Sequence, residues 1–355
     1  MFRELASDGA RRTSFPLLAE NQMQLLDRSL ELDTALRAVA RACNAAMAVR
    51  REIADAGAGT IVKDDKSPVT VADFAAQAVV AAALQHAFGD DPLVGEESSD
   101  SLRAVGEEGT RARVVEAVCE ATGMSVDEGT VLDWLDRGRA VGDTRRYWVL
   151  DPVDGTKGFL RGGQFAVALA LIEDGQPTVA VLGCPAYEAS DLTRPGLLLA
   201  ASRGLGAFEV PLHGFATAAR RPLRVDRSKA ASACRMCESV ESGHTDQSAS
   251  ERIVRELGIH GDALRMDSQA KYAAVARGDA DLYLRLPTRK GYQEKVWDHA
   301  AGVLVLQEAG GTITDVDGAP LDFRHGTTLA KNRGVIASAC GEHAHIVEVV
   351  RRALG

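Results

Sequence analysis

The sequence has few cysteines and no excess of basic residues. Six cysteines among 355 residues are too sparse for a disulfide scaffold, so we expect reduced thiols. The chain has 41 Lys and Arg residues against 50 Asp and Glu residues, which gives a formal net charge of −9. Proteins that bind the backbone of duplex DNA usually present a basic face. Nucleic acid is therefore not an expected partner of this chain.

Long hydrophobic runs are also absent. The longest apolar stretches, 165–172 and 179–184, are separated by a charged turn and fall far short of the roughly 20 residues that a membrane helix needs. The first residues, MFRELASDGARR, have no apolar core of the signal-peptide type, and Glu4 and Asp8 weaken their similarity to a transit peptide. We therefore expect a cytoplasmic protein without a membrane partner.

Three common functional motifs are incomplete. Gly204 and Gly206 lack the third glycine of a dinucleotide-binding fingerprint because residue 209 is Glu, and no Gly-Lys pair exists for a P-loop. Cys234 and Cys237 form a CxxC, but no second CxxC completes a zinc site, so we interpret both as structural. Dehydrogenase and kinase functions are therefore not supported.

The composition that remains is that of an ordinary globular protein, 46% apolar and 26% charged. At roughly 150 residues per domain, the length predicts about two domains with room for a cleft between them. A cluster of Pro and Gly at 195–206 is the expected boundary. We therefore divide the chain into a tail at 1–20, a domain at 21–205 and a second domain at 206–355.

Helical and extended patterns both occur along the chain, which predicts an α+β protein. Helices follow from apolar periodicity and capping residues, and strands from apolar runs bounded by turn residues. The expected helices are 22–56, 70–88, 113–121, one opened by a capping box of Ser125 and Glu128, 249–257, 268–277, 297–309 and 343–354. The expected strands are 147–150, 164–173, 177–184, 280–286 and 335–339, with Asp174 and Gly175 as a hairpin turn. The charged region 99–146 is interpreted as an insertion in the first domain.

Acidic residues gather at four places that are strand ends or loops rather than solvated helix faces. They are Asp64 with Asp65, Glu96 with Glu97, Asp151 with Asp154, and Asp298. Any one of them alone is most often a turn or an exposed face. Carboxylates that converge repel one another unless cations lie between them, and oxygen ligands are those that Mg²⁺ prefers. Together they predict metal-assisted hydrolysis of a phosphoester.

Four motifs, in this order, resemble the magnesium-dependent, lithium-sensitive inositol monophosphatase superfamily. They are DKSPVT at 65–70, VGEES at 94–98, WVLDPVDGTKGF at 148–159 and VWDHAAG at 296–302. The segments 157–172, 267–272 (DSQAKY), 281–287 (DLYLRLP) and 292–302 are similar to its 3′(2′),5′-bisphosphate nucleotidase branch. The resemblance runs from residue 32 to residue 339. It implies a two-domain α+β sandwich layered α/β/α/β/α, of the inositol monophosphatase and fructose-1,6-bisphosphatase type, with the site in the cleft.

The resemblance also implies a metal centre with two or three Mg²⁺ ions per site. Glu96, Asp151 and the carbonyl of Val153 resemble the ligands of one ion, while Asp151, Asp154 and Asp298 resemble those of a second. In many members a third, weaker ion lies beside Glu96.

The same resemblance assigns the catalytic and phosphate-binding groups. Asp65 resembles the carboxylate that, with Thr156, orients the attacking water. The backbone N–H groups of Gly155 and Thr156 would hold oxygens of the reacting phosphate at the start of a helix.

Substrate contacts are implied in the second half of the chain. The resemblance implies that His244 lies near the base of a bound nucleotide. It also implies that the 5′-phosphate of that nucleotide is bound by Ser268, Lys271 and Arg285. The expected enzyme is a phosphoric monoester hydrolase that removes the 3′-phosphate of adenosine 3′,5′-bisphosphate (PAP) to give AMP, by in-line attack of a metal-activated water, with PAPS as a second substrate. The alternative is an inositol phosphate or sugar bisphosphate phosphatase on the same scaffold. The partner is then a small-molecule nucleotide, and we expect a monomer or a weak dimer.

Overall fold

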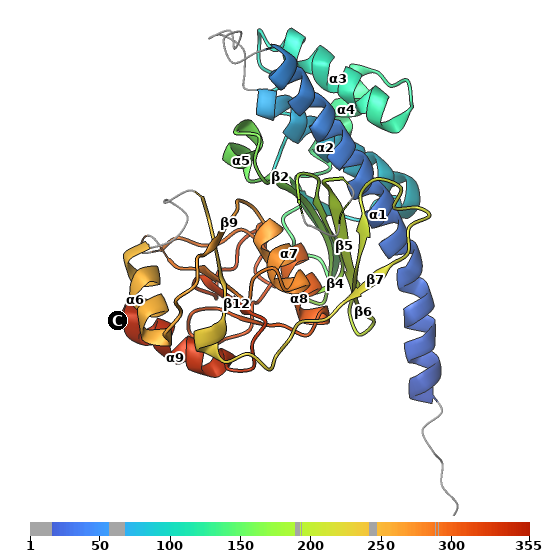
Figure 1. The fold of residues 1–355 in the computed structure, drawn as a ribbon. Helices are drawn as coiled ribbons and strands as arrows, with labels where there is room; N and C mark the ends of the chain where they lie inside the picture. Colours follow the sequence, from blue (N-terminus) through green and yellow to red (C-terminus); the bar gives the residue numbers. More distant parts are fainter. Residues whose placement is uncertain are drawn as a thin grey trace, which may run out of the picture.

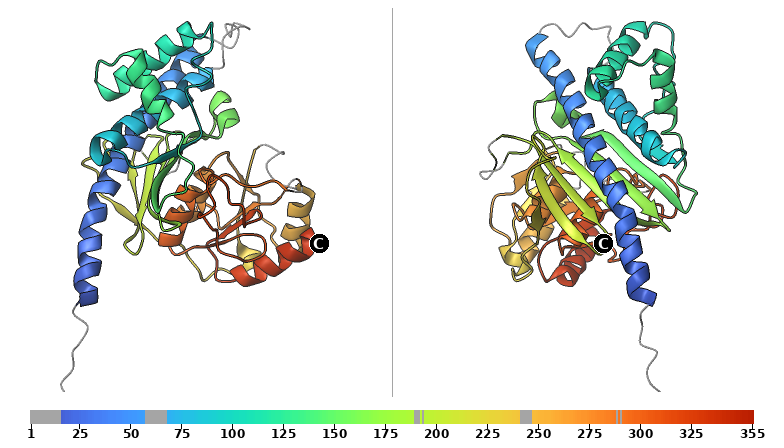
Figure 2. Two further views of the ribbon diagram at one scale, coloured as in Figure 1. Left: turned by 180° about the vertical axis from the view of Figure 1, so that it is seen from behind. Right: turned by 90° about the vertical axis from the view of Figure 1, so that its right-hand side faces the viewer.

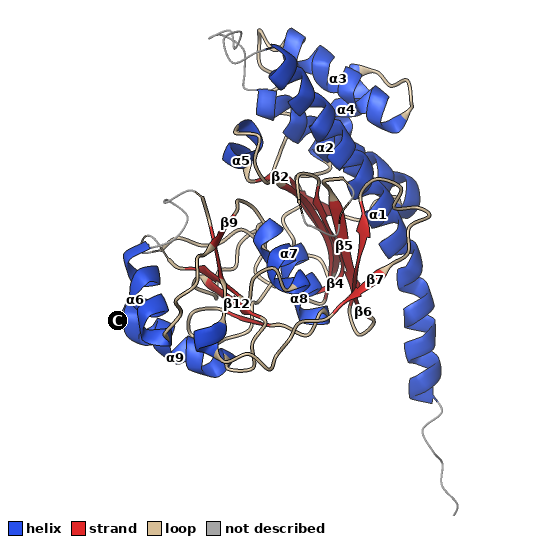
Figure 3. Ribbon diagram, viewed as in Figure 1, coloured by secondary structure: helices blue, strands red, loops and turns tan. Residues whose placement is uncertain are grey.

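The computed structural model describes residues 16–56, 68–188, 192, 194–240, 247–287, 289 and 291–355. Helices and sheets alternate in five layers, α/β/α/β/α, as the sequence predicts (Figures 1 and 3). The outer helical layer on one side is formed by α1 (Pro16–Ala56) and α2 (Pro68–Phe88). Both views of Figure 2 show α1 crossing the first sheet and extending beyond it toward the N-terminus. This layer packs against strands β2 (Arg146–Asp154) to β5 (Leu197–Ser202) of the first sheet.

The first sheet has seven strands in the order in which they occur along the chain. Its strands are β1 (Leu93–Gly95), β2 (Arg146–Asp154), β3 (Ala166–Glu173), β4 (Gln176–Cys184), β5 (Leu197–Ser202), β6 (Gly206–Pro211) and β7 (Arg221–Leu223). The pair of β1 and β2 is parallel, and every later pair is antiparallel. This sheet is therefore a meander with one crossover between its first two strands. Short turns join β3 to β4 and β5 to β6, and the other connections are longer.

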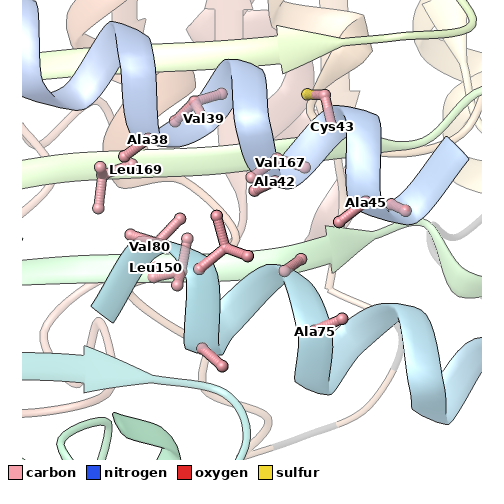
Figure 4. Packing of buried hydrophobic residues seen from close by; sticks show 14 of the residues in the cluster. Ala38, Val39, Ala42, Cys43, Ala45, Ala75, Val80, Leu150, Val167 and Leu169 are labelled. Carbon is pink, nitrogen blue, oxygen red and sulfur yellow. The ribbon is translucent and has the colours of Figure 1, made fainter. Parts of the chain in front are cut away.

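Both faces of the first sheet are buried, and the side-chain alternation of β3 shows how. Val167 and Leu169 belong to the apolar core under α1 and α2, where Figure 4 shows Ala38, Ala42 and Leu150 close by. The intervening residues of β3 belong to the core on the opposite face. Because every position packs against one layer or the other, β3 reads as a continuous apolar run rather than an alternating one.

The middle layer of helices is shared by two sheets. It consists of α7 (Ala270–Arg277) and α8 (Ala300–Glu308), and α8 packs against β3, β4, β5 and β6. The second sheet has the order β11 (Thr312–Thr314), β12 (Val335–Ser338), β10 (Leu282–Arg285), β8 (Met236–Glu238) and β9 (Leu264–Arg265). Its far face packs against α6 (Gln247–Leu257) and α9 (His343–Leu354). These helices complete the fifth layer.

The region 99–146 contains two helices that pack on the outer layer, α3 (Glu108–Thr122) and α4 (Glu128–Asp136). The expected capping box of Ser125 and Glu128 is wrong. Asp127 is the N-cap of α4, and its carboxylate accepts a hydrogen bond from the backbone N–H of Thr130 at 2.7 Å. A short acidic side chain placed directly before the first helical residue competes well for that N–H.

Most other expected elements are present, with shifted ends. The Asp174 and Gly175 turn is confirmed, with positive φ angles of 49° and 74° between β3 and β4. The first helix begins at Pro16, inside the expected tail 1–20. The first sheet includes β6 and β7, so the division expected between residues 205 and 206 does not coincide with the division between the sheets. The Gly-rich segment there is a hairpin turn within one sheet.

Two further expectations concern α2 and the cysteines. The window 71–88 of α2 is long and apolar enough to cross a bilayer by composition, but 72% of it is buried inside the protein, as in a core helix. All six cysteines are free thiols. Cys234 and Cys237 are buried in the second half of the molecule, which fits a structural role.

Candidate active site

A cavity of about 260 Å³ lies between the end of β2 and the residues that precede α7 and α8. Every predicted site residue that the structure describes lines it. The full lining comprises Glu96, Asp151, Val153, Asp154, Gly155, Thr156, Lys157, Gly158, Asp267, Ser268, Gln269, Lys271, Tyr283, Arg285 and Asp298. Asp64, Asp65 and His244 lie outside the described residues. The cavity therefore combines groups from both sheets.

The end of β2 brings two carboxylates to the cavity. Residues 151 and 154 are three apart, so a regular strand would point their side chains to opposite faces. The register with β3 shifts between Asp151, which pairs with Ala168, and Asp154, which pairs with Ala166. This irregularity resembles a β-bulge, which re-aims side chains near active sites. Both carboxylates consequently face the same space.

The segment after β2 begins a short helix at the cavity wall. In α5 (Thr156–Leu160), Gly155 occupies the position before the helix with a φ of 88°. A Cβ atom at Gly155 would lie 2.9 Å from the Cβ atom of Ser268, so the close approach of the two chain segments also requires glycine. The first backbone N–H groups of a helix have no partner within it. Those of α5 lie at the cavity, where an anion can accept from them.

Cationic side chains reach the cavity from the second half of the chain. Lys271 on α7 is only 2% exposed, and its Nζ atom lies 5.1 Å from the centre of the Tyr283 ring. Burial lowers the pKa of Lys271, and the negative charge of Asp154 acts in the opposite direction. Ser268 precedes α7 with a φ of 69°, which is rare for a residue with a side chain and is tolerated where the surrounding structure enforces it.

Arg285 on β10 lies at the cavity but is paired with acidic groups. Its Nε atom contacts Glu294 Oε2 at 2.7 Å, and a second nitrogen donates to Asp298 Oδ2 at 3.2 Å. Glu294, Asp298 and His299 offer carboxylate and imidazole atoms within 4.8 Å of one another. The guanidinium of Arg285 offsets part of the negative charge of the two carboxylates, and His299 Nδ1 is engaged by the Tyr272 hydroxyl at 2.8 Å. Arg285 therefore positions Asp298 in addition to lining the cavity.

The carboxylates that line the cavity, those of Glu96, Asp151, Asp154 and Asp298, have the properties of a cation site. Burial, followed by the charges of Glu96, Asp154 and Asp298, raises the pKa of Asp151 well above its usual value. The Oδ1 atom of Asp151 is buried and has no hydrogen-bond partner among the residues that the structure describes. A buried acceptor without a partner is costly, and a bound cation would satisfy it. Because the donors are all oxygen atoms, the set fits a hard divalent ion such as Mg²⁺.

The unusual pKa of Glu96 predicts a pH effect on the stability of the metal-free protein. Although part of this side chain is exposed, withdrawal from water and then the charge of Asp298 raise its pKa from 4.5 to about 7. Between these values the folded chain keeps a proton that the unfolded chain has lost, so stability falls as pH rises. Thermal unfolding in EDTA is expected to show this fall, and Glu96→Gln is expected to reduce it. Parallel profiles for the two proteins would contradict this interpretation.

Several lining residues were not singled out from the sequence. Tyr283 and Lys157 line the cavity, and Asp267 accepts a hydrogen bond from Arg161, just beyond α5. Gln269 also lines it and donates its backbone N–H to Asp154 Oδ2. Asp267 and Gln269 lie within the DSQAKY segment, and Tyr283 within DLYLRLP. Their position within these two segments was therefore the only sequence signal that could have indicated a place in the site.

Comparison with known proteins shows which family the chain belongs to. The sequence profile of the inositol monophosphatase family matches residues 30–353. The chain belongs to that family. Among relatives, the 3′(2′),5′-bisphosphate nucleotidase of Schizosaccharomyces pombe is 44% identical over 305 residues, which cover 82% of this chain and 86% of that protein. The nucleotidase of Oryza sativa is 39% identical over 330 residues, which cover 87% and 90%.

Solved structures of the inositol monophosphatase family share the fold. An inositol monophosphatase from Zymomonas mobilis superposes with a TM-score of 0.62 at 20% identity, and the match covers 91% of this chain and 98% of that one. One from Anabaena gives a TM-score of 0.59 at 21% identity and covers 92% and 97%. At such identities the likeness establishes the fold alone. Membership of this family implies that the enzyme uses a divalent metal.

Proposed function

We propose that this chain is a magnesium-dependent 3′(2′),5′-bisphosphate nucleotidase that converts PAP to AMP and phosphate, with PAPS as a second substrate. One observation carries the proposal. A single cavity is lined both by a cluster of carboxylates and by the buried cation Lys271, which comes from a different layer of the fold. A ligand with two phosphate groups matches that arrangement, because one group is hydrolysed at the metals while the other is held at the cation. The names of the similar nucleotidases support this assignment.

Glu96, Asp151, Asp154, Asp298 and the carbonyl of Val153 would hold the ions. When bound, the Mg²⁺ ions lower the pKa of a water molecule and neutralise charge on the reacting phosphate. Groups of the chain itself orient the reacting phosphate and the attacking water. The backbone N–H groups at the start of α5 would donate hydrogen bonds to the oxygens of the reacting phosphate, and Thr156 with Asp65 orients the attacking water.

The second phosphate of the substrate is held by the groups that precede and begin α7. The ammonium of Lys271 and the hydroxyl of Ser268 would bind the 5′-phosphate, and Arg285 adds positive charge beside it. A buried ammonium binds a phosphate more strongly than an exposed one because water screens it less. This contact distinguishes a bisphosphate from a monophosphate, and His244 is proposed to lie near the base.

The function is tested by phosphate release from a panel of four substrates: PAP, PAPS, inositol 1-phosphate and fructose 1,6-bisphosphate, each with and without Mg²⁺. We expect magnesium-dependent release that is fastest with PAP. Faster release from inositol 1-phosphate or fructose 1,6-bisphosphate would replace the proposal by the inositol or sugar phosphate alternative.

Lys271 provides a test of substrate recognition. The substitution Lys271→Met keeps an unbranched apolar side chain at this buried position and removes the charge. Because a charge-assisted hydrogen bond contributes roughly 1.5 to 3 kcal/mol, kcat/KM for PAP is expected to fall by about ten- to a hundredfold. Adenosine 3′-monophosphate lacks the 5′-phosphate, so its kcat/KM is expected to change little.

The matched control is Lys229→Met. Lys229 pairs with Asp281 at 2.7 Å and does not line the cavity, so this variant should leave the preference between the two substrates unchanged. An equal loss on both substrates in Lys271→Met would place Lys271 at the metals or in the fold instead.

A further inference from the structure

Gln269 joins the end of β2 to the segment that leads into and begins α8. Its backbone N–H donates to Asp154 Oδ2 at the end of β2. Its side-chain Nε2 donates to the carbonyl of Trp297 at 2.8 Å, and its Oε1 accepts from the N–H of Gly302 in α8 at 3.1 Å. Trp297 directly precedes Asp298. One buried residue therefore fixes the segments that carry two of the acidic groups.

Gln77 makes an analogous set of contacts on the other side of the cavity. This side chain on α2 is fully buried. Its Nε2 donates to the carbonyl of Glu97 at 2.6 Å, and its Oε1 accepts from the N–H of the same residue at 3.0 Å. Glu97 directly follows Glu96. Gln77 therefore holds both backbone polar groups of the residue next to a third acidic group.

The space around the Gln77 amide is closely fitted to it. A Cβ atom at Gly95 would lie 2.5 Å from its Oε1, and one at Gly138 would lie 2.5 Å from its Nε2. Nε2 also donates to the carbonyl of Leu135 at 3.2 Å, so each polar atom of the amide has a partner. Such a fully bonded amide allows very little movement of the loop that carries Glu96.

We propose that Gln77 and Gln269 are positioning residues that set the separation of the carboxylates for magnesium. Neither amide needs to touch the metal or the substrate. Mg²⁺ requires near-ideal octahedral geometry, so its affinity is sensitive to small displacements of its ligands. Groups that orient metal ligands from behind typically contribute a factor of 10 to 100 in metal affinity. The inference rests on the magnesium site of the proposed function.

The test uses Gln77→Met and Gln269→Met, which keep the length and approximate volume of glutamine and remove the hydrogen bonds of the side-chain amide, while the backbone N–H of residue 269 is retained. Magnesium binding to the substrate-free protein is measured by calorimetry, and thermal unfolding is measured in EDTA. Each variant is expected to bind Mg²⁺ at least about tenfold more weakly than the wild type. If either Met variant does not fold, the corresponding Asn variant, which shortens the amide by one methylene, takes its place with the same expectation.

The control is Asn332→Leu. Asn332 is a buried amide that does not line the cavity, and it bonds the Asp315 carboxylate at 3.0 Å, the Pro320 carbonyl at 2.9 Å and the N–H of Asp322 at 2.8 Å. This variant should lose stability like the glutamine variants and keep the wild-type magnesium affinity. Unchanged affinity in the glutamine variants would overturn the inference while leaving the proposed function intact. A wild-type protein that binds no Mg²⁺ would overturn both.

Discussion

Asp151→Asn is expected to lower kcat by at least about a hundredfold while raising the thermal stability of the metal-free protein. The loss of activity follows from the removal of a charge that a bound cation and the transition state both need. The gain in stability follows because burial and the neighbouring carboxylates raise the pKa of Asp151, so that its charge is unfavourable in the folded state. Steady-state kinetics and thermal unfolding in EDTA measure the two effects.

Asp315→Asn is the matched control for this experiment. Asp315 is also buried, but it accepts hydrogen bonds from Asp317, Ala319 and Asn332 and lies outside the cavity lining. Here the carboxylate is stabilising, so the variant should be less stable and retain kcat. An Asp151→Asn protein that is both destabilised and fully active would show that Asp151 has a structural role only.

Removal of the metal is expected to abolish turnover altogether. The Oδ1 atom of Asp151 has no partner among the described residues, and burial, followed by mutual repulsion, raises the pKa values of Glu96, Asp151 and Asp154. Phosphate release should therefore cease in excess EDTA and return with millimolar Mg²⁺, since sites with few carboxylates and several waters bind this ion modestly. Excess Ca²⁺ is expected to inhibit because it occupies oxygen sites with looser geometry.

A second readout separates metal binding from catalysis. Mg²⁺ added without substrate should raise the unfolding temperature, because a ligand that binds only the folded state stabilises it. Full activity in EDTA would exclude the metal-dependent mechanism. The lithium sensitivity that the family resemblance implies is a separate property, and its absence would leave this mechanism standing.

The layered fold was predictable from the sequence because long motifs carried the resemblance and apolar runs marked the strands. The hairpin at Asp174 and Gly175 is an example in which local turn chemistry was sufficient. The capping residue of α4 could not be predicted in this way. Ser125 and Asp127 both precede the helix, and only the backbone geometry selects between them. The continuation of the first sheet through β6 and β7 was not predictable either, because a Gly-rich turn within a sheet and a linker between domains have the same composition. The division of the chain into domains stays a prediction.

The candidate site was predictable in its residues more than in its contacts. The motifs predicted that the acidic groups and Lys271 lie at one site, and those that the structure describes line one cavity. The pairing of Arg285 with Glu294 and Asp298 depends on distances between β10 and the loop before α8, which spacing along the chain does not determine. The bonds of Gln77 and Gln269 likewise depend on packing between layers. For Asp65 and His244, the sequence-based roles remain predictions.

The middle helical layer has a consequence for how this enzyme is assembled. The helix α8 packs against four strands of the first sheet, while α7 packs against β8 and β10. The hydrophobic core between the two sheets is therefore built from both halves of the chain. A fragment that ends after β7 would expose the apolar face that α7 and α8 normally cover, and a fragment that begins there would leave those helices bare on one side. We therefore expect the two halves to fold as a single cooperative unit, and proteolysis between them to yield aggregated pieces rather than two independent modules.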